Sequence, residues 1–227
     1  MVKSIEKLKF QDLMQYRVHE ILLVASPYDA FILEQDGRLS EQILTEFKGM
    51  NLSYAPRIWS AHTAKKALDM IKERPYDLII VMLRISDMGP ISFAQKIKNK
   101  YPRKPMILLA FDESEVKALK NRIESVFDNV FIWTGNSNVF AAIIKYVEDK
   151  RNVKKDIASG DVRIILLVED NVRYYSTFFP EVYREVLYYT KELMSKSLND
   201  AHRLIRMRAR PKILLAKNYE KAKKYFD

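Results

Sequence analysis

Short apolar runs alternate with amphipathic segments along most of the chain. The runs predict five strands, over residues 20–24, 56–61, 76–83, 105–110 and 130–133. Between them, apolar side chains recur every three or four positions, which predicts helices over residues 28–47, 64–72, 91–100, 113–125 and 138–148. Strands that alternate with helices form a parallel sheet covered on both faces by right-handed crossovers. Residues 19–150 are therefore predicted to form an α/β domain with a doubly wound, five-stranded sheet.

Two weaker segments flank this domain. Residues 1–18 carry an imperfect apolar stripe of Ile5, Leu8, Leu13 and Met14. We expect this segment to be a helical extension that packs on the domain, with a partner surface as the alternative. Residues 151–161 are polar and short of large apolar side chains, which is typical of a linker.

A second unit begins at residue 162 and repeats the start of the first. Its strand, residues 162–171, contains the same ILLV core as the first strand, and it ends in two carboxylates, Glu169 and Asp170. In residues 172–210, aromatic and apolar side chains recur every three or four positions, which predicts a long helix with a broad aromatic face. A second strand and helix are predicted to follow. The aromatic side chains are interface candidates, either within the chain or between chains: Tyr174, Tyr175, Phe178, Phe179 and Tyr183.

This second unit, residues 162–227, corresponds only to the first part of the repeated pattern. A fragment with an open strand edge and an uncovered apolar face is poorly stabilised alone. We therefore expect that the chain was cut from a longer protein in which the unit is completed. The alternative is a tail that packs on the first domain or exchanges between protomers.

The composition is that of a globular protein, with 48% hydrophobic and 30% charged residues in 227. The absence of cysteine excludes disulfides and thiolate metal sites. Because neither a membrane span nor an export signal is recognisable, we expect a cytoplasmic location. The formal charge of +10 is expected to lie on solvated helix faces. No recognition-helix motif accompanies the basic stretches, so neither specific nucleic acid nor membrane is an expected partner.

The stretch from Tyr76 to Pro90 is where chemistry would be expected. An apolar strand runs there into a polar loop, and ligands of open parallel sheets bind outside the carboxyl ends of the strands. The residue at the strand end is Met82, which has no acid–base chemistry. Asp87 follows in the loop and is expected to be a turn residue.

This stretch resembles the third strand and following loop of bacterial response-regulator receiver domains, a flavodoxin-like family with strand order 2-1-3-4-5. On that pattern the phosphate-accepting aspartate is replaced by Met82, and the acidic pair that holds magnesium by Ala25 and Ser26. The hydroxyl residue of the fourth strand is replaced by Ala110, and the lysine of the fifth by Trp133. The resemblance implies a pseudo-receiver that binds no cofactor in its first domain.

Such a module is expected to work in two-component signalling by binding a protein partner or a second copy, without catalysis. Receivers commonly use the face that corresponds to residues 113–148 for dimerisation. An unrelated flavodoxin-like domain with an apolar ligand crevice, lined by Met82 and Trp133, is the alternative. In a complete second receiver, Glu169 and Asp170 would be magnesium ligands; in this chain a weak ion pair with Lys217 or Arg173 is the alternative.

A second resemblance concerns an enzyme. The sequences FQDLMQYRVHEILLVASPYDAFILEQDGRL and RMRARPKILLA, residues 10–39 and 206–216, are similar to the amino-terminal part of large bacterial proteins with a phosphoenolpyruvate/pyruvate-binding, dikinase-like domain. The chain would then be the regulatory segment of an ATP-dependent phosphotransferase. None of the catalytic residues of such an enzyme lies in residues 1–227.

Overall fold

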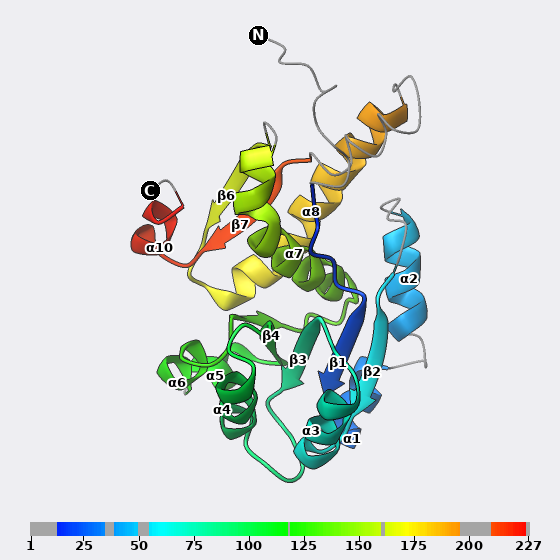
Figure 1. The fold of residues 1–227 in the computed structure, drawn as a ribbon, viewed down its shortest axis with the longest axis vertical. Coiled ribbons are helices and arrows are strands. Elements are labelled where there is room, and N and C mark those ends of the chain that lie inside the picture. Colours follow the sequence, from blue (N-terminus) through cyan, green and yellow to red (C-terminus); the bar gives the residue numbers. More distant parts are fainter. Residues whose placement is uncertain are drawn as a thin grey trace.

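The computed structural model of the protein describes residues 13–34, 39–49, 55–117, 119–159, 162–195 and 210–225 (Figure 1). Its larger sheet has five parallel strands in the order β2-β1-β3-β4-β5. They are β1 (Glu20–Val24), β2 (Arg57–Ala61), β3 (Leu78–Met82), β4 (Met106–Ala110) and β5 (Asn129–Ile132). This order confirms the predicted flavodoxin-like, doubly wound α/β fold.

The central strands are buried on both faces. Every residue of β3 and β4 is buried, and so is β1 after its first residue. A covered parallel strand needs apolar side chains at each position rather than at every second one. This explains the continuous runs LIIVM and MILLA, whereas the edge strand β2 is partly exposed and has the mixed sequence RIWSA.

Helices cover both faces of the sheet, and each face has its own apolar core (Figure 1). One core includes α1 (Pro27–Leu33), α2 (Leu39–Gly49) and α7 (Asn138–Ser159). The other includes α3 (Ala64–Glu73), α4 (Pro90–Lys100), α5 (Glu113–Lys117) and α6 (Lys120–Glu124). The helix predicted over residues 113–125 is thus divided into two short helices. Within the described ranges, no helix combines the length and apolar character that crossing a bilayer requires.

The second unit packs on the first domain. It consists of β6 (Ile164–Val168), α8 (Val172–Ser195), β7 (Lys212–Ala216) and α10 (Tyr219–Lys223), and β6 pairs with β7 in parallel. Helix α8 lies against α7 and β5. The unit is thus packed on the first domain, as the alternative expectation has it, while its completion in a longer protein stays a prediction.

The outer edge of β5 is closed by α8. The Val130 carbonyl accepts a hydrogen bond from the Tyr175 hydroxyl at 2.6 Å, and the Ile132 N–H donates to Ser176 Oγ at 2.9 Å. Both backbone groups point away from β4, where a further strand would otherwise pair. Helix α8 therefore satisfies the edge of the sheet instead of an additional strand.

The edge of β7 is closed by α7 in the same manner. The Ile213 N–H donates to Asp149 Oδ2 at 2.9 Å, and the Ile213 carbonyl accepts from the Tyr183 hydroxyl at 3.3 Å. Asp149 also forms a two-pronged ion pair with the Arg210 guanidinium, at 2.7 and 3.0 Å, in which both side chains are buried. A second buried pair joins Lys212 to Asp156 of α7 at 2.8 Å.

The prediction of a linker over residues 151–161 was wrong for the residues that the structure describes. Residues 151–159 are not a linker but the last turns of α7, while residues 160–161 lie outside the described residues. Two of the polar side chains that suggested a solvated connection, Asn152 and Asp156, are buried there because they bind other parts of the chain, whereas the basic side chains of this stretch are exposed. The polarity of Asn152 and Asp156 serves internal hydrogen bonds and an ion pair.

The prediction of a helical extension was also wrong for the described part of the amino-terminal segment, because residues 13–19 form no helix. The N–H groups of Met14, Tyr16 and Val18 donate to side chains of α7 at positions 156, 152 and 148, over 2.9, 2.8 and 3.0 Å. Two residues of extended chain advance about 6.6 Å, and four helical residues advance about 6 Å. An extended segment therefore matches this row of polar side chains. Residues 1–12 of the predicted extension lie outside the described residues.

Candidate functional site

The carboxyl ends of the strands bring all five predicted site positions to one edge of the larger sheet. The Ala25 N–H donates to the Ala61 carbonyl at 3.1 Å, and the Ser26 N–H donates to the Arg84 carbonyl at 2.9 Å. Met82 ends β3 and Ala110 ends β4, while the Trp133 N–H donates to the Ala110 carbonyl at 2.7 Å. None of these five side chains is a carboxylate or an amine.

These side chains already have structural roles. Ala25, Met82 and Ala110 are buried in the core, and Trp133 packs edge-on against Phe140 with ring centroids 5.9 Å apart. The Ser26 hydroxyl accepts from the Asp29 N–H at 3.0 Å and so caps α1. The edge is therefore filled by apolar packing and a helix cap.

An ionic cluster beside this edge was missed in the sequence. The Arg84 guanidinium contacts two carboxylates. Its Nη2 lies 3.0 Å from Glu115 Oε1, and its Nη1 lies 3.9 Å from Asp29 Oδ1. Asp29 is only 1% exposed, and its Oδ1 has no hydrogen-bond partner among the described residues. Burial raises the pKa of Asp29, and the charge of Arg84 opposes that rise. In the sequence, Asp29 resembles an ordinary first-turn acid, and nothing marks it as buried.

Asp87, which we expected to be a turn residue, lies in the loop after β3 and contacts the start of another helix. Its carboxylate accepts from the N–H groups of Ala64 and Lys65, at 2.6 and 3.0 Å, at the start of α3. Hydrogen bonds from Lys65 and Ala64 lower the pKa of Asp87. The carboxylate thus stabilises the amino terminus of a helix.

The two carboxylates of the second unit follow β6. Glu169 Oε1 accepts from the Asn171 N–H at 2.8 Å, and Asp170 is exposed. We considered Lys217 as an ion-pair partner of these carboxylates; its Nζ lies 3.8 Å from Glu124 Oε1. Among the described residues, no three histidine, aspartate or glutamate side chains gather as a metal would require. Magnesium binding by Glu169 and Asp170 in a complete second receiver stays a proposal.

The aromatic face of α8 divides into two rows. Tyr175, Phe179 and Tyr183 recur every four residues and are buried against the first domain, so they are not available to a partner. Phe179 packs on Tyr183 with centroids 5.0 Å apart. Tyr174 and Phe178 form the adjacent row and remain more than half exposed. Only these two of the five interface candidates lie on the surface.

Comparison with known proteins finds no matching family model and no matching curated protein. Among solved structures, the chain is similar to the chemotaxis response regulator CheY4 of Vibrio cholerae, with 14% identity and a TM-score of 0.44, over 57% of this chain and 98% of that one. It is similar to a two-component response regulator from Clostridium difficile, with 21% identity and a TM-score of 0.44, over 59% of this chain and 98% of that one. It is also similar to the receiver domain of NtrX from Brucella abortus, with 14% identity and a TM-score of 0.45, over 57% and 98%. The strand order and register described above define the fold without these similarities.

Proposed function

We propose that the chain is a receiver-like regulatory module that acts through protein contacts and accepts no phosphoryl group in its first domain. The observation that carries this proposal is the carboxyl edge of the larger sheet. Met82 and Ala110 end two adjacent strands there, where a phosphorylated receiver needs an oxygen nucleophile and a hydroxyl. A thioether and a methyl group supply neither.

The neighbouring charges support the same proposal. Magnesium requires several hard oxygen ligands, and at this edge Ala25 and Ser26 supply one hydroxyl that already caps a helix. The guanidinium of Arg84 lies between the carboxylates of Asp29 and Glu115. A positive charge is thus already present beside the edge, so the module has no need of a metal to balance its acids.

Incubation with acetyl phosphate and magnesium, followed by intact-mass measurement, tests the proposal. We expect no phosphorylated species from the wild-type chain. The variants Asp87→Asn and Asp112→Asn are the matched controls for any label on the loop carboxylates that follow β3 and β4. Stoichiometric labelling that hydroxylamine removes, as it removes acyl phosphates, would refute the proposal whether or not Asp87 carries the label.

We further propose that the protein partner is a second copy, bound at the outer edge of β6. The register of β6 with β7 directs the backbone groups of Ile164, Leu166 and Val168 away from β7. The side chains of Ile164, Ile165 and Val168 are 37%, 36% and 53% exposed. An apolar strand with an unpaired edge favours pairing with another strand.

The charges of β6 are complementary to themselves. Antiparallel pairing of two copies about Leu166 sets Ile164 opposite Val168 of the second copy. It also sets Arg163 opposite Glu169 of the second copy, on the same face of the sheet, and the two-fold axis repeats that pair. The edge thus combines apolar contacts with two ion pairs.

Light scattering with a charge-exchange series tests the dimer. We expect a dimeric wild-type chain, a weakened dimer for Glu169→Arg, and recovery in the double variant Arg163→Glu/Glu169→Arg. Asp170→Arg makes the same charge change one residue further on and is expected to have a smaller effect. A monomeric wild-type chain, or a double variant weaker than the single one, contradicts this pairing.

The alternative function is the regulatory segment of an ATP-dependent, dikinase-like phosphotransferase. Its support is the sequence resemblance of residues 10–39 and 206–216, and its catalytic residues would lie outside this chain. The test is expression of the longest reading frame that contains the chain, followed by an assay for ATP-dependent phosphorylation of pyruvate. A frame that encodes no such domain removes this alternative.

A further inference from the structure

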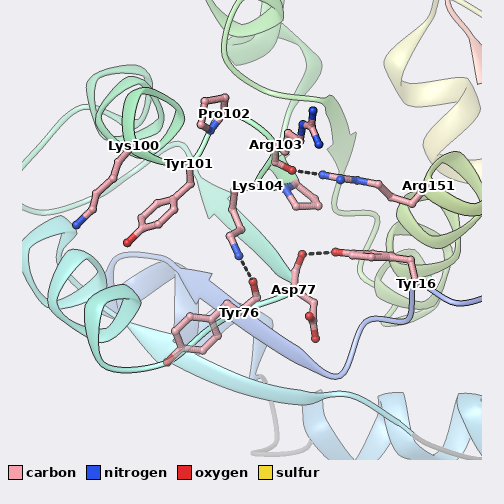
Figure 2. Close-up of a pocket in the computed structure, with 10 residues that line it drawn as sticks. Tyr16, Tyr76, Asp77, Lys100, Tyr101, Pro102, Arg103, Lys104 and Arg151 are labelled. Atoms are coloured by element: carbon pink, nitrogen blue, oxygen red, sulfur yellow. Dashed lines mark hydrogen bonds between the residues drawn. The ribbon is translucent and has the colours of Figure 1, made fainter.

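A pocket of about 530 Å³ lies at the amino-terminal edge of the larger sheet, opposite to the site described above (Figure 2). Tyr76 and Asp77 line it just before β3, and the turn of residues 100–105 lines it between α4 and β4. Tyr16 from the amino-terminal segment and Arg151 from α7 complete it. Its volume is in the range of sites for small molecules.

The pocket carries an excess of positive charge. Lys100, Arg103, Lys104 and Arg151 line it, and among the described residues none of these four forms an ion pair. By contrast Lys98, on the same helix as Lys100, is paired with Asp128 at 2.9 Å. The one carboxylate in the lining, Asp77, accepts from the N–H groups of residues 19 and 20 at 2.8 and 3.0 Å. The Asp77 carboxylate therefore accepts hydrogen bonds from the backbone and forms no ion pair with the four cations.

Carbonyl groups hold two of these cations, Lys104 and Arg151, in position without neutralising them. Lys104 Nζ donates to the Tyr76 carbonyl at 2.5 Å, and Arg151 donates to the Arg103 carbonyl (Figure 2). Burial lowers the pKa of Lys104, and the nearby charge of Arg151 lowers it further against the opposing effect of Asp77. Like charges are thus close together in the pocket, and an anion would relieve their repulsion.

Aromatic rings lie beside the cations. The Tyr101 ring centroid is 5.5 Å from Lys100 Nζ, and the Tyr16 ring centroid is 5.4 Å from Arg151 Cζ. Tyr101 is partly exposed and lines the pocket. A ligand that carries both a flat ring and a phosphate would use both kinds of side chain.

We propose that this pocket binds a small phosphorylated molecule of nucleotide size, with its phosphates at Arg103, Lys104 and Arg151 and its ring on Tyr101. Arginine and lysine together provide forked and single donors for phosphate oxygens. The limited volume of the pocket, with the four cations gathered around one hollow, favours a small molecule over an extended nucleic-acid backbone. This site is independent of the carboxyl edge of the sheet and of the proposed dimer.

Calorimetric titration with ADP, pyrophosphate and adenosine tests the site. We expect ADP to bind, pyrophosphate to bind more weakly and adenosine to bind least. Loss of one charge-assisted contact in Arg103→Met or Arg151→Met should weaken ADP binding by about tenfold or more. Lys191→Met, which removes an exposed charge on α8, is the matched control and should leave the affinity unchanged.

Circular dichroism of each variant checks that the fold is retained. Both arginines are exposed, but Arg103→Met is the safer variant because the Arg151 side chain also donates to the Arg103 carbonyl. No heat of binding for ADP or pyrophosphate at millimolar concentration overturns the proposal. Equal losses in Lys191→Met and the pocket variants would overturn it as well, because charge alone would then explain binding. Equal affinity for ADP and pyrophosphate overturns the role of Tyr101. Tighter binding of a polyglutamate peptide than of ADP would make the pocket a protein-docking site instead.

Discussion

The Asp149 carboxylate is the group whose removal should most weaken the attachment of the second unit. It accepts hydrogen bonds from both terminal nitrogens of Arg210, from the Tyr183 hydroxyl and from the Ile213 N–H. The Arg210 side chain is 1% exposed and that of Asp149 is fully buried. Burial lowers the pKa of Arg210, but the charge and hydrogen bonds of Asp149, together with Tyr183 and Glu148, raise it on balance, so the guanidinium stays charged. Asp149→Ala would leave this buried charge without its carboxylate.

The expected cost follows from that geometry. Breaking a buried ion pair from one side costs about 3–5 kcal/mol. Since every 1.4 kcal/mol is a factor of ten, the unfolding constant should rise roughly a hundredfold to several thousandfold. Arg210→Ala alone should also destabilise the protein. The double variant should cost less than the sum of the two single changes, because no uncompensated charge remains.

Urea denaturation followed by circular dichroism measures these differences, and hydrogen exchange at the Ile213 amide reports the strand edge itself. Glu181→Ala is the control, since it breaks an exposed pair with Arg184 on α8 that is expected to contribute below about 1 kcal/mol. A cost for Asp149→Ala no greater than that of the control would refute the reasoning. So would slow exchange at Ile213 in the Asp149→Ala variant.

Two further predictions concern single hydrogen bonds. Ser176→Ala should destabilise the protein by about 1–3 kcal/mol, because the buried Ile132 N–H loses its acceptor; Ser176→Thr, which keeps a hydroxyl, is the comparison in urea denaturation. Asp87→Asn should change the acid dependence of stability. Because the folded-state pKa of Asp87 is lowered, its contribution is present above the unfolded pKa of about 3.9 and is lost as the pH falls through the folded value. Wild type and variant should therefore converge in thermal midpoint at low pH, and a gap that persists there would contradict this.

The sheet was predictable because its signals are local. The runs that became β3 and β4 are continuous and apolar, and a strand buried on both faces requires that pattern whatever its neighbours are. Thr63 likewise caps α3 with its own hydroxyl, as its place before the helix indicates. Each of these features depends on a few consecutive residues.

The candidate site was predictable only in part. The positions Met82 and Ala110 follow from counting to the ends of strands, and parallel pairing then brings such ends to one edge. The contact of Arg84 with Asp29 and Glu115 depends on how a loop and two helices are arranged in space. No spacing in the sequence encodes that arrangement. The pocket lined by Lys104 and Arg151 was missed for the same reason, because it joins segments far apart in the chain.

The sequence by itself determined the class of fold, the order of its elements and the presence of a methionine, Met82, at the end of β3. The tertiary structure decided which polar residues are solvated and which are internal. Asp156 and Asn152 suggested a linker because a polar residue has the same sequence signature in both settings. Their partners, Lys212 and Tyr16, lie 56 and 136 residues away. Burying a polar group is unfavourable until such a partner is present, so only the folded chain distinguishes the two settings.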